Sequence, residues 1–225
     1  MTMARLSLAG AALLPDPSGV LVWPDAETLV VADLHLEKGS AYARHGMLLP
    51  PYDTRQTLLR LEDALRRHRP RRVIALGDSF HDGDAAARLD AGDLTRLTSL
   101  VAAHDWFWVA GNHDPAPPAG IGGHCVDNMA VGPLIFAHRA IDGSGVGEVT
   151  GHFHPKAALR QRGRRVGGRC FVGDATRLIL PAFGAYTGGL DVLDPAIDRF
   201  FPMGFIARIL GRHRIHAVPR AVLAG

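Results

Sequence analysis

The feature that most constrains the fold is an alternation of strand-like and helix-like segments in the first half of the chain. Short apolar runs rich in Val and Leu, typical of buried strands, alternate with segments whose apolar residues recur at helical spacing. The strands are predicted at residues 20–23, 28–32, 72–77 and 106–110, and the helices at residues 53–68 and 84–103. Asp53 or Thr54 is a suitable N-cap for the first helix. This order predicts parallel strands joined by right-handed crossovers.

The second half has a different pattern, in which short strands follow one another through Gly-rich turns. These strands are predicted at residues 124–131, 133–138, 147–151, 156–161, 165–172 and 176–181. Such a succession is typical of an antiparallel sheet, and residues 215–218 are a candidate edge strand. Two facing sheets with helices outside form the coherent architecture. The chain has no internal repeat or long linker, so residues 1–225 are predicted to form a single domain.

The composition is that of an ordinary globular protein, with 47% hydrophobic and 21% charged residues. The two cysteines are too few for a disulfide framework or a thiolate zinc site. Pro15, Asp16 and Pro17 interrupt the N-terminal apolar stretch, and no run reaches the roughly 18 apolar residues that a membrane span needs. We therefore expect a soluble, cytoplasmic protein that does not enter a membrane.

Side chains that can bind metal ions follow the ends of the predicted strands. They are Asp33, His35, Asp78, Asn112, His138, His152 and His154. Ligands of open α/β sheets gather beyond the carboxyl ends of the strands, so these side chains are expected to converge. Taken singly, Asp and Asn at such places indicate turns or helix caps, but the ordered set indicates a metal site. His124 is a weaker alternative to His138.

The spacing and chemistry of these candidates fit two divalent cations. In Asp33-x-His35 and His152-x-His154 the outer residues are two apart, so in an extended segment they would point to the same side. Three glycines, each directly before a candidate ligand, let the backbone turn tightly there. Carboxylates with imidazoles suit Mn, Fe or Zn. Asp78 would be shared between cations roughly 3.5–4 Å apart, a pair that activates a bridging water and clamps a phosphate.

The motifs Asp-x-His, Gly-Asp, Gly-Asn-His-Asp, His and Gly-His-x-His occur in this order between residues 29 and 155. In this the chain resembles the calcineurin-like metallophosphoesterases. The resemblance implies an αββα sandwich of two mixed sheets flanked by helices. It also implies a first metal bound by Asp33, His35 and His154, and a second bound by Asn112, His138 and His152, with Asp78 between them. By the same resemblance, His113 would protonate the leaving oxygen, and Asp114 would orient His113.

Two further stretches, residues 77–82 and 178–190, are similar to the bacterial ligase-associated DNA damage response endonucleases. This resemblance implies a Mn-dependent phosphodiesterase that acts on single-stranded or flap DNA in DNA repair. A metal-bridging hydroxide would attack the scissile phosphate in line with the leaving oxygen. The resemblance also implies functional association with a DEXH helicase, an ATP-dependent DNA ligase and an exonuclease. His81 would contact the substrate phosphate or serve only in a turn. One departure is Arg139, where a carboxylate or glycine is expected after the ligand His138.

The sequence also offers candidate contacts to nucleic acid. Arg160, Arg162 and Arg164 follow the last metal-binding motif closely and occupy alternate positions, so they are expected to share one face of a hairpin beside the site. Trp106 and Trp108 could stack on bases, but their place on a predicted buried strand favours core packing.

Three other functions compete with a DNA endonuclease. A small-molecule hydrolase, acting on nucleotides or on simple phosphate monoesters and diesters, would use the same metal ligands. A phosphoprotein phosphatase would carry Asp-Arg-Gly where this chain has His81-Asp82-Gly83, so the phosphate-clamping Arg is missing. A binding scaffold that has lost its metals would lack several ligands, whereas this chain lacks none.

Overall fold

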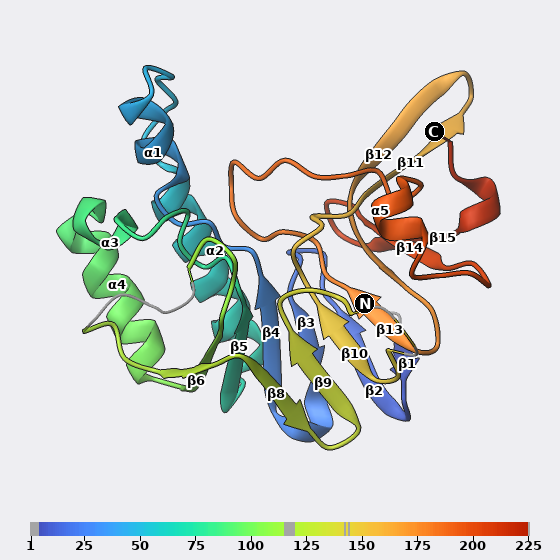
Figure 1. The fold of residues 1–225 in the computed structure, drawn as a ribbon, viewed down its shortest axis with the longest axis horizontal. Coiled ribbons are helices and arrows are strands. Elements are labelled where there is room, and N and C mark those ends of the chain that lie inside the picture. The colour runs from blue at the N-terminus through green and yellow to red at the C-terminus, as the bar shows by residue number, and fades with distance from the viewer. Residues whose placement is uncertain (1–4, 115–119, 142, 144, 225) are drawn as a thin grey trace.

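The computed structural model describes residues 5–114, 120–141, 143 and 145–224, and two β-sheets form its centre (Figure 1). The first sheet has seven strands. In spatial order they are β1 (Leu6–Leu8), β2 (Ala11–Pro15), β3 (Leu21–Trp23), β4 (Thr28–Ala32), β5 (Arg72–Leu76), β6 (Asp105–Val109) and β7 (His124–Val126). The run from β4 to β7 is parallel, as the strand–helix alternation predicts, and β4 is buried along its whole length.

The second sheet has eight strands and is mixed. Its path runs through β15 (Ile215–Pro219), β14 (Ile206–Leu210), β12 (Arg164–Gly173), β13 (Arg177–Ile179), β10 (Glu148–Thr150), β9 (Leu134–Ala137) and β8 (Asn128–Val131), and β11 (Lys156–Gln161) pairs with β12. The prediction of an antiparallel sheet is wrong for β9, β10 and β13, which are mutually parallel. Crossover connections join these three strands, because the whole β11–β12 hairpin intervenes between β10 and β13. The predicted edge strand near residue 215 is confirmed as β15.

Helices cover the outer faces of the sheets. They are α1 (Lys38–Arg44), α2 (Asp53–His68), α3 (Ala85–Arg88), α4 (Ala91–Ala102) and α5 (Pro195–Asp198), with short 3₁₀ turns at Pro24–Ala26 and Arg220–Val222. The boundaries predicted for α2 are confirmed. The single helix predicted over residues 84–103 is wrong, because it is divided into α3 and α4. Asp90 causes the break: its side chain accepts a hydrogen bond from the Gly92 N–H and starts α4 anew.

The predicted N-caps of α2 have a different role. Tyr52 occupies the N-cap position without a capping side chain. Asp53 instead accepts a hydrogen bond from the Gly39 N–H at 2.9 Å, and Thr54 accepts one from the Glu37 N–H at 2.8 Å. Both side chains therefore fix the start of α1, which follows directly on the candidate ligand His35.

One predicted strand, over residues 124–131, contributes to both sheets. The strand is interrupted at Asp127. As a result, β7 is the edge strand of the first sheet and β8 is an edge strand of the second. The strands β1, β2 and β14 and the helices α1 and α5 have no counterpart in the sequence prediction.

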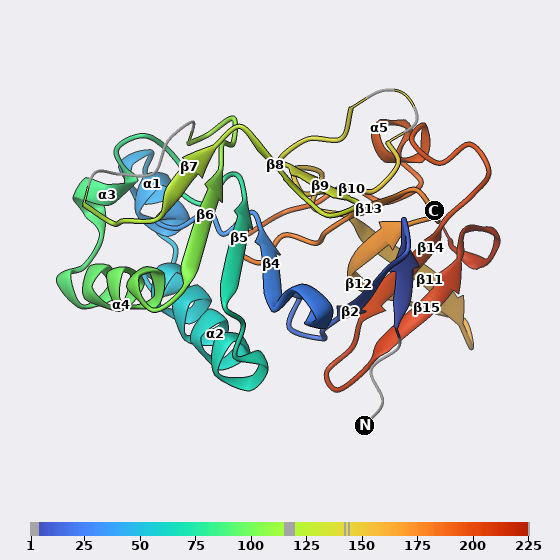
Figure 2. The same cartoon turned by 90° about the horizontal axis from the view of Figure 1, so that it is seen from below.

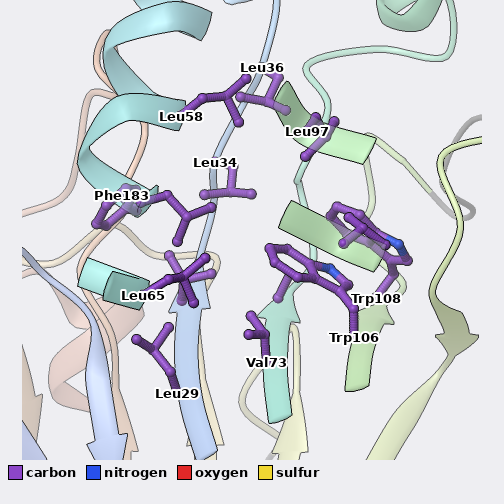
Figure 3. Packing of buried hydrophobic residues seen from close by; sticks show 14 of the residues in the cluster. Leu29, Leu34, Leu36, Leu58, Leu65, Val73, Leu97, Trp106, Trp108 and Phe183 are labelled. Carbon is purple, nitrogen blue, oxygen red and sulfur yellow. The ribbon is translucent and has the colours of Figure 1, made fainter. Parts of the chain in front are cut away.

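Figure 2 shows α2 and α4 beside the strands β4, β5 and β6 of the first sheet. Three clusters of buried apolar side chains hold the helices and sheets together. Leu58, Leu65 and Leu97 of the helices pack on the outer face of the first sheet against Trp106 and Trp108, which confirms a core role for both tryptophans (Figure 3). A second cluster fills the space between the two sheets, and a third joins the outer face of the second sheet to α5 and the following segment. The predicted αββα sandwich is therefore confirmed.

None of the helices in the described part of the chain has the length and apolar character that crossing a bilayer requires.

Candidate metal centre

The candidate ligands come together where the carboxyl ends of strands from both sheets meet. Asp33 and His35 follow β4, Asp78 follows β5, and Asn112 follows β6. His138 follows β9, and His152 and His154 follow β10. Two groups of potential ligand atoms form there, each with its atoms within 4.8 Å of one another. The groups are Asp33, His35 and His154, and Asp78, His138 and His152.

In the second group, to which Asn112 is adjacent, the potential ligand atoms lie close to His138 Nε2. Nε2 of His138 lies 2.9 Å from Asn112 Oδ1, 3.2 Å from His152 Nδ1 and 3.4 Å from Asp78 Oδ2. Ligand atoms about 2.0–2.2 Å from a common metal ion lie at such separations from each other. The His138 Nδ1–H donates to the Leu76 carbonyl at 3.0 Å, which directs the Nε2 lone pair at the centre. His138 thus belongs to a group that could hold a metal ion, whereas His124 lies exposed on β7.

The first group is built in the same way and lies beside the second. Nε2 of His154 is 3.2 Å from His35 Nε2 and 3.4 Å from Asp33 Oδ1. Asp78 Oδ2 also lies 3.9 Å from His35 Nε2, so this one oxygen faces both groups. The donor set of imidazoles, carboxylates and one amide fits two divalent cations that share Asp78.

The backbone reaches this arrangement through left-handed turns. The φ angles of Asp33, His35, Asp78, His152 and His154 lie between 44° and 70°. The predicted extended geometry of the two D/H-x-H motifs is therefore wrong, and His152 and His154 enter different groups. Strain of this kind persists only when neighbouring bonds enforce it. Here the His35 N–H donates to the Asp78 carbonyl at 2.9 Å, and the His152 N–H donates to the Asp33 carboxylate at 3.0 Å.

The electrostatics favour metal ligation. Burial, followed by the neighbouring charge of His154, lowers the pKa of His35 to about 3. Burial and the neighbouring His138 lower the pKa of His152 to about 4. Burial acts to raise the pKa of Asp78, but the hydrogen bond and charge of His138, the hydrogen bond from the His113 N–H and the charge of His35 together hold this pKa well below its usual range. At neutral pH these imidazoles are neutral and the carboxylate is ionised, which are the forms that bind metal.

His113, the expected general acid, lies at the open side of the centre. Its side chain is 44% exposed, and its Nε2 lies 4.0 Å from Asp78 Oδ2. The Nδ1–H donates to the His81 carbonyl at 3.0 Å, and the two imidazole rings stack with their centroids 5.5 Å apart. His81 and His113 therefore form one unit, which also contacts the ring of His35.

The expectation that Asp114 orients His113 is wrong. Oδ2 of Asp114 accepts hydrogen bonds from the N–H groups of Ser79 and Phe80, at 2.7 and 2.9 Å. Burial, with a smaller contribution from the charge of Asp78, raises the pKa of Asp114 to about 7. Asp114 thus holds the turn that carries Asp78, while the His81 carbonyl orients His113.

The hairpin arginines do not share one face. In the β11–β12 hairpin Arg160 pairs with Arg165, and Gln161 pairs with Arg164. Paired residues point to the same side, so Arg160 and Arg164 lie on opposite faces. Arg162 occupies the two-residue turn, with φ at 50°. The turn changes which residues of the second strand point to a given face. The alternation of side chains counted along the sequence therefore does not continue through the turn.

The sequence pattern did not predict that Lys38 and Tyr42, on α1, lie next to His81. Nζ of Lys38 lies 5.7 Å from the centroid of the Tyr42 ring, and that ring contacts His81 edge-on at 5.9 Å. After burial, the charge of Lys38 is the next cause of the lowered pKa of His81. A signal was present: the chain has only two lysines, and Lys38 and Lys156 each lie within three residues of a metal ligand.

The glycines before the ligands serve mainly to permit close approach. Of the three, only Gly77 has a positive φ, at 66°. A Cβ at Gly151 would lie 2.7 Å from Asp33 Oδ2, and one at Gly111 would fall within 3.0 Å of the Asp78 backbone nitrogen. A side chain at either position would therefore collide with a neighbouring candidate ligand.

We expect Gly111→Ala to displace Asp78, lower the metal content and destabilise the fold by about 1–3 kcal/mol, as overpacking typically does. Gly83→Ala is the matched control, because a Cβ there meets nothing within 4 Å. Metal analysis and urea denaturation measure both effects. Equal metal content and equal unfolding midpoints in the two variants would contradict the close-approach argument.

Comparison with known proteins agrees with this geometry. The calcineurin-like phosphoesterase family matches residues 27–165, more than half of the chain. The nuclease MPE of Pseudomonas putida has a similar structure, with a TM-score of 0.73 and 24% identity over 96% of this chain and 100% of that protein.

A more distant similarity links the chain to Yfce, a phosphoesterase from E. coli, with a TM-score of 0.42 and 11% identity over 87% of this chain and 98% of that one. No curated protein matches the sequence significantly. The similarity to the P. putida protein concerns the fold, whereas the family match spans every candidate metal ligand. The chain therefore belongs to the calcineurin-like phosphoesterase family.

Proposed function

We propose that this phosphoester hydrolase is a dinuclear phosphodiesterase that cuts DNA internally, with single-stranded or flap DNA as substrate and Mn²⁺ as the activating metal. The observation that carries the proposal is the pair of adjacent donor groups that share Asp78. Fe or Zn would also suit these donors. A role in DNA repair, with a helicase, a ligase and an exonuclease as functional partners, follows from the sequence resemblance and is part of the same proposal.

The residues around the centre can divide the work of hydrolysis among them. Two bound cations would supply Lewis-acid activation of water and charge neutralisation for an in-line displacement at phosphorus. His113 is placed at the open side to protonate the leaving oxygen, and His81 holds it there through its carbonyl. The His81 imidazole lies next to His113 and can contact the phosphate.

Two observations support a nucleic acid as the substrate. The chain is basic, with a net charge of +3, and its exposed arginines include Arg160, Arg162 and Arg164 on the hairpin after the metal-binding motif. The similar fold of the P. putida protein, which is a nuclease, is compatible with this reading.

The test compares circular single-stranded DNA with simple phosphate esters in the presence of Mn²⁺. We expect the circle to be linearised, which requires an internal cut, and bis(p-nitrophenyl) phosphate to be hydrolysed faster than p-nitrophenyl phosphate. Protein carrying Asp78→Ala, purified in parallel, controls for contaminating nucleases. Rapid hydrolysis of the monoester with the circle left intact would favour a small-molecule phosphatase instead.

A further inference from the structure

One face of the β11–β12 hairpin carries a row of cations. The pairs Lys156–Arg169 and Arg160–Arg165 lie directly opposite each other across the two strands. Opposed residues, and residues two or four apart on one strand, point to the same side of a sheet. These four cations therefore share one side of the hairpin, which we name the Lys156 face.

The opposite face of the hairpin is occupied at its base by the protein core. Ala157, Leu159 and Cys170 alternate with the residues of the Lys156 face and pack in the cluster that includes Phe153 and Phe205. The base of the hairpin thus has one closed side and one side that is free to receive a ligand.

The free side forms a groove of about 630 Å³. Lys156, Arg165 and Arg169 line it together with small residues of the hairpin, and Ala185, Thr187 and Asp191 form the other wall. The small residues include Ala158 and Gly167, which are paired across the two strands and give the groove a low floor between the cations. We call this feature the hairpin groove.

The wall of the hairpin groove is anchored to the first group of metal ligands. In the segment 184–191, the Gly184 N–H donates to the Asp33 carbonyl at 3.0 Å. Gly189 lies so close to the His154 carbonyl that a Cβ would overlap it, and the same Cβ would touch Lys156 Cε at 3.1 Å. The groove therefore begins beside the metal centre, at Lys156.

Two of the four cations on this face are engaged within the protein, and two are available to a ligand. Arg165 pairs with Asp191 at 3.1 Å, and Arg169 donates to the Ala182 carbonyl at 2.9 Å. Among the residues that the structure describes, Lys156 and Arg160 have no carboxylate partner. At about 3.3 Å per residue along a strand, these two positions are about 13 Å apart, so they would contact different phosphates.

We propose that the hairpin groove holds the phosphates of a single DNA strand next to the scissile one. Lys156, which lines the groove, and Arg160, which lies beyond its lining on the same face of the hairpin, are the contacts that attract the strand. The inference rests on the proposed nuclease function, and it narrows the three candidate arginines to Arg160. Arg162 lies in the turn and Arg164 on the opposite face.

The test uses two double variants that remove equal charge from the same hairpin. Each phosphate contact to a single strand contributes about 0.7 to the slope of log affinity against log salt concentration. Lys156→Gln with Arg160→Gln should lower this slope by about 1.4 for a labelled oligodeoxythymidylate, if each residue contacts one phosphate. Arg162→Gln with Arg164→Gln should leave the slope unchanged. Salt titrations of kcat/KM with metal-loaded enzyme, and of fluorescence anisotropy after EDTA treatment, measure it with and without turnover.

Hydrolysis of bis(p-nitrophenyl) phosphate should be unchanged in both double variants, because a small diester does not reach the groove. Equal slopes for the wild-type protein and the Lys156/Arg160 variant, or an equal decrease in both variants, would overturn the groove assignment while DNA cleavage itself persisted. A wild-type protein that hydrolysed small esters but left DNA uncut would instead overturn the proposed function.

Discussion

Replacement of Asp78 by alanine should remove both metal ions and abolish hydrolysis. Oδ2 of Asp78 lies 3.4 Å from His138 Nε2 in one donor group and 3.9 Å from His35 Nε2 in the other. Asp33 Oδ1 also lies 3.8 Å from His138, but from Nδ1, the ring nitrogen that donates to the Leu76 carbonyl and not the one that faces the donor group. Loss of this oxygen takes a ligand from each cation and the negative charge that holds the two cations together.

The fold should survive this change, because alanine removes only the bond that Asp78 Oδ1 accepts from the His113 N–H and keeps the backbone bond to His35. In that backbone bond the Asp78 carbonyl accepts the His35 N–H. Metal analysis after dialysis, with circular dichroism as the check on folding, measures the outcome. Asp82→Ala is the matched control, since it removes an acidic side chain four residues away that pairs with Arg88. Two equivalents of metal bound to folded Asp78→Ala protein would contradict the shared role of Asp78.

The candidate ligands could be predicted from sequence because their positions depend on simple rules. Each follows a buried strand, and strand ends of a layered α/β fold meet at one edge. Their conformation could not be predicted in this way. Asp and His adopt a left-handed φ more often than most residues, but this weak preference does not show that Asp33, Asp78 and His154 will do so. Hydrogen bonds from distant segments to the Asp33 and Asp78 carbonyls help to hold that conformation.

Where prediction failed, contacts between distant residues decided the structure. Asp114 follows His113 directly, yet its carboxylate turns to the backbone of Ser79 and Phe80, whose N–H groups need an acceptor. Asp127 likewise separates what reads as one strand, because its two halves complete the edges of different sheets. The periodicity of the local sequence predicts neither the partners of the Asp114 carboxylate nor the interruption of the strand at Asp127.

Replacement of His113 by alanine should slow DNA cleavage by about 10²–10⁴-fold, the usual contribution of a general acid, while the metal content stays near normal. The structure supports this separation of roles. The His113 side chain stands outside both donor groups, and its Nδ1–H is held by the His81 carbonyl. The other ring nitrogen, Nε2, is thereby directed to the side of Asp78, at 4.0 Å from Oδ2, where it can deliver a proton to a leaving oxygen. His124→Ala, which removes an exposed imidazole on β7, is the control and should retain full activity.

The leaving group distinguishes proton donation from a merely structural role of His113. The alkoxide that leaves when DNA is cut is a strong base and needs a proton in the transition state, whereas p-nitrophenolate is stable without one. The loss caused by His113→Ala should therefore be much smaller for bis(p-nitrophenyl) phosphate than for DNA. If the variant lost the same factor on both substrates, or lost metal along with activity, His113 would be supporting the metal centre and the proton would have to come from elsewhere. In His81→Ala the backbone carbonyl that accepts the His113 Nδ1–H stays in place, whereas the stacked His81 ring is lost. Any loss of activity in that variant would therefore report contacts of the His81 ring, either with His113 or with the substrate.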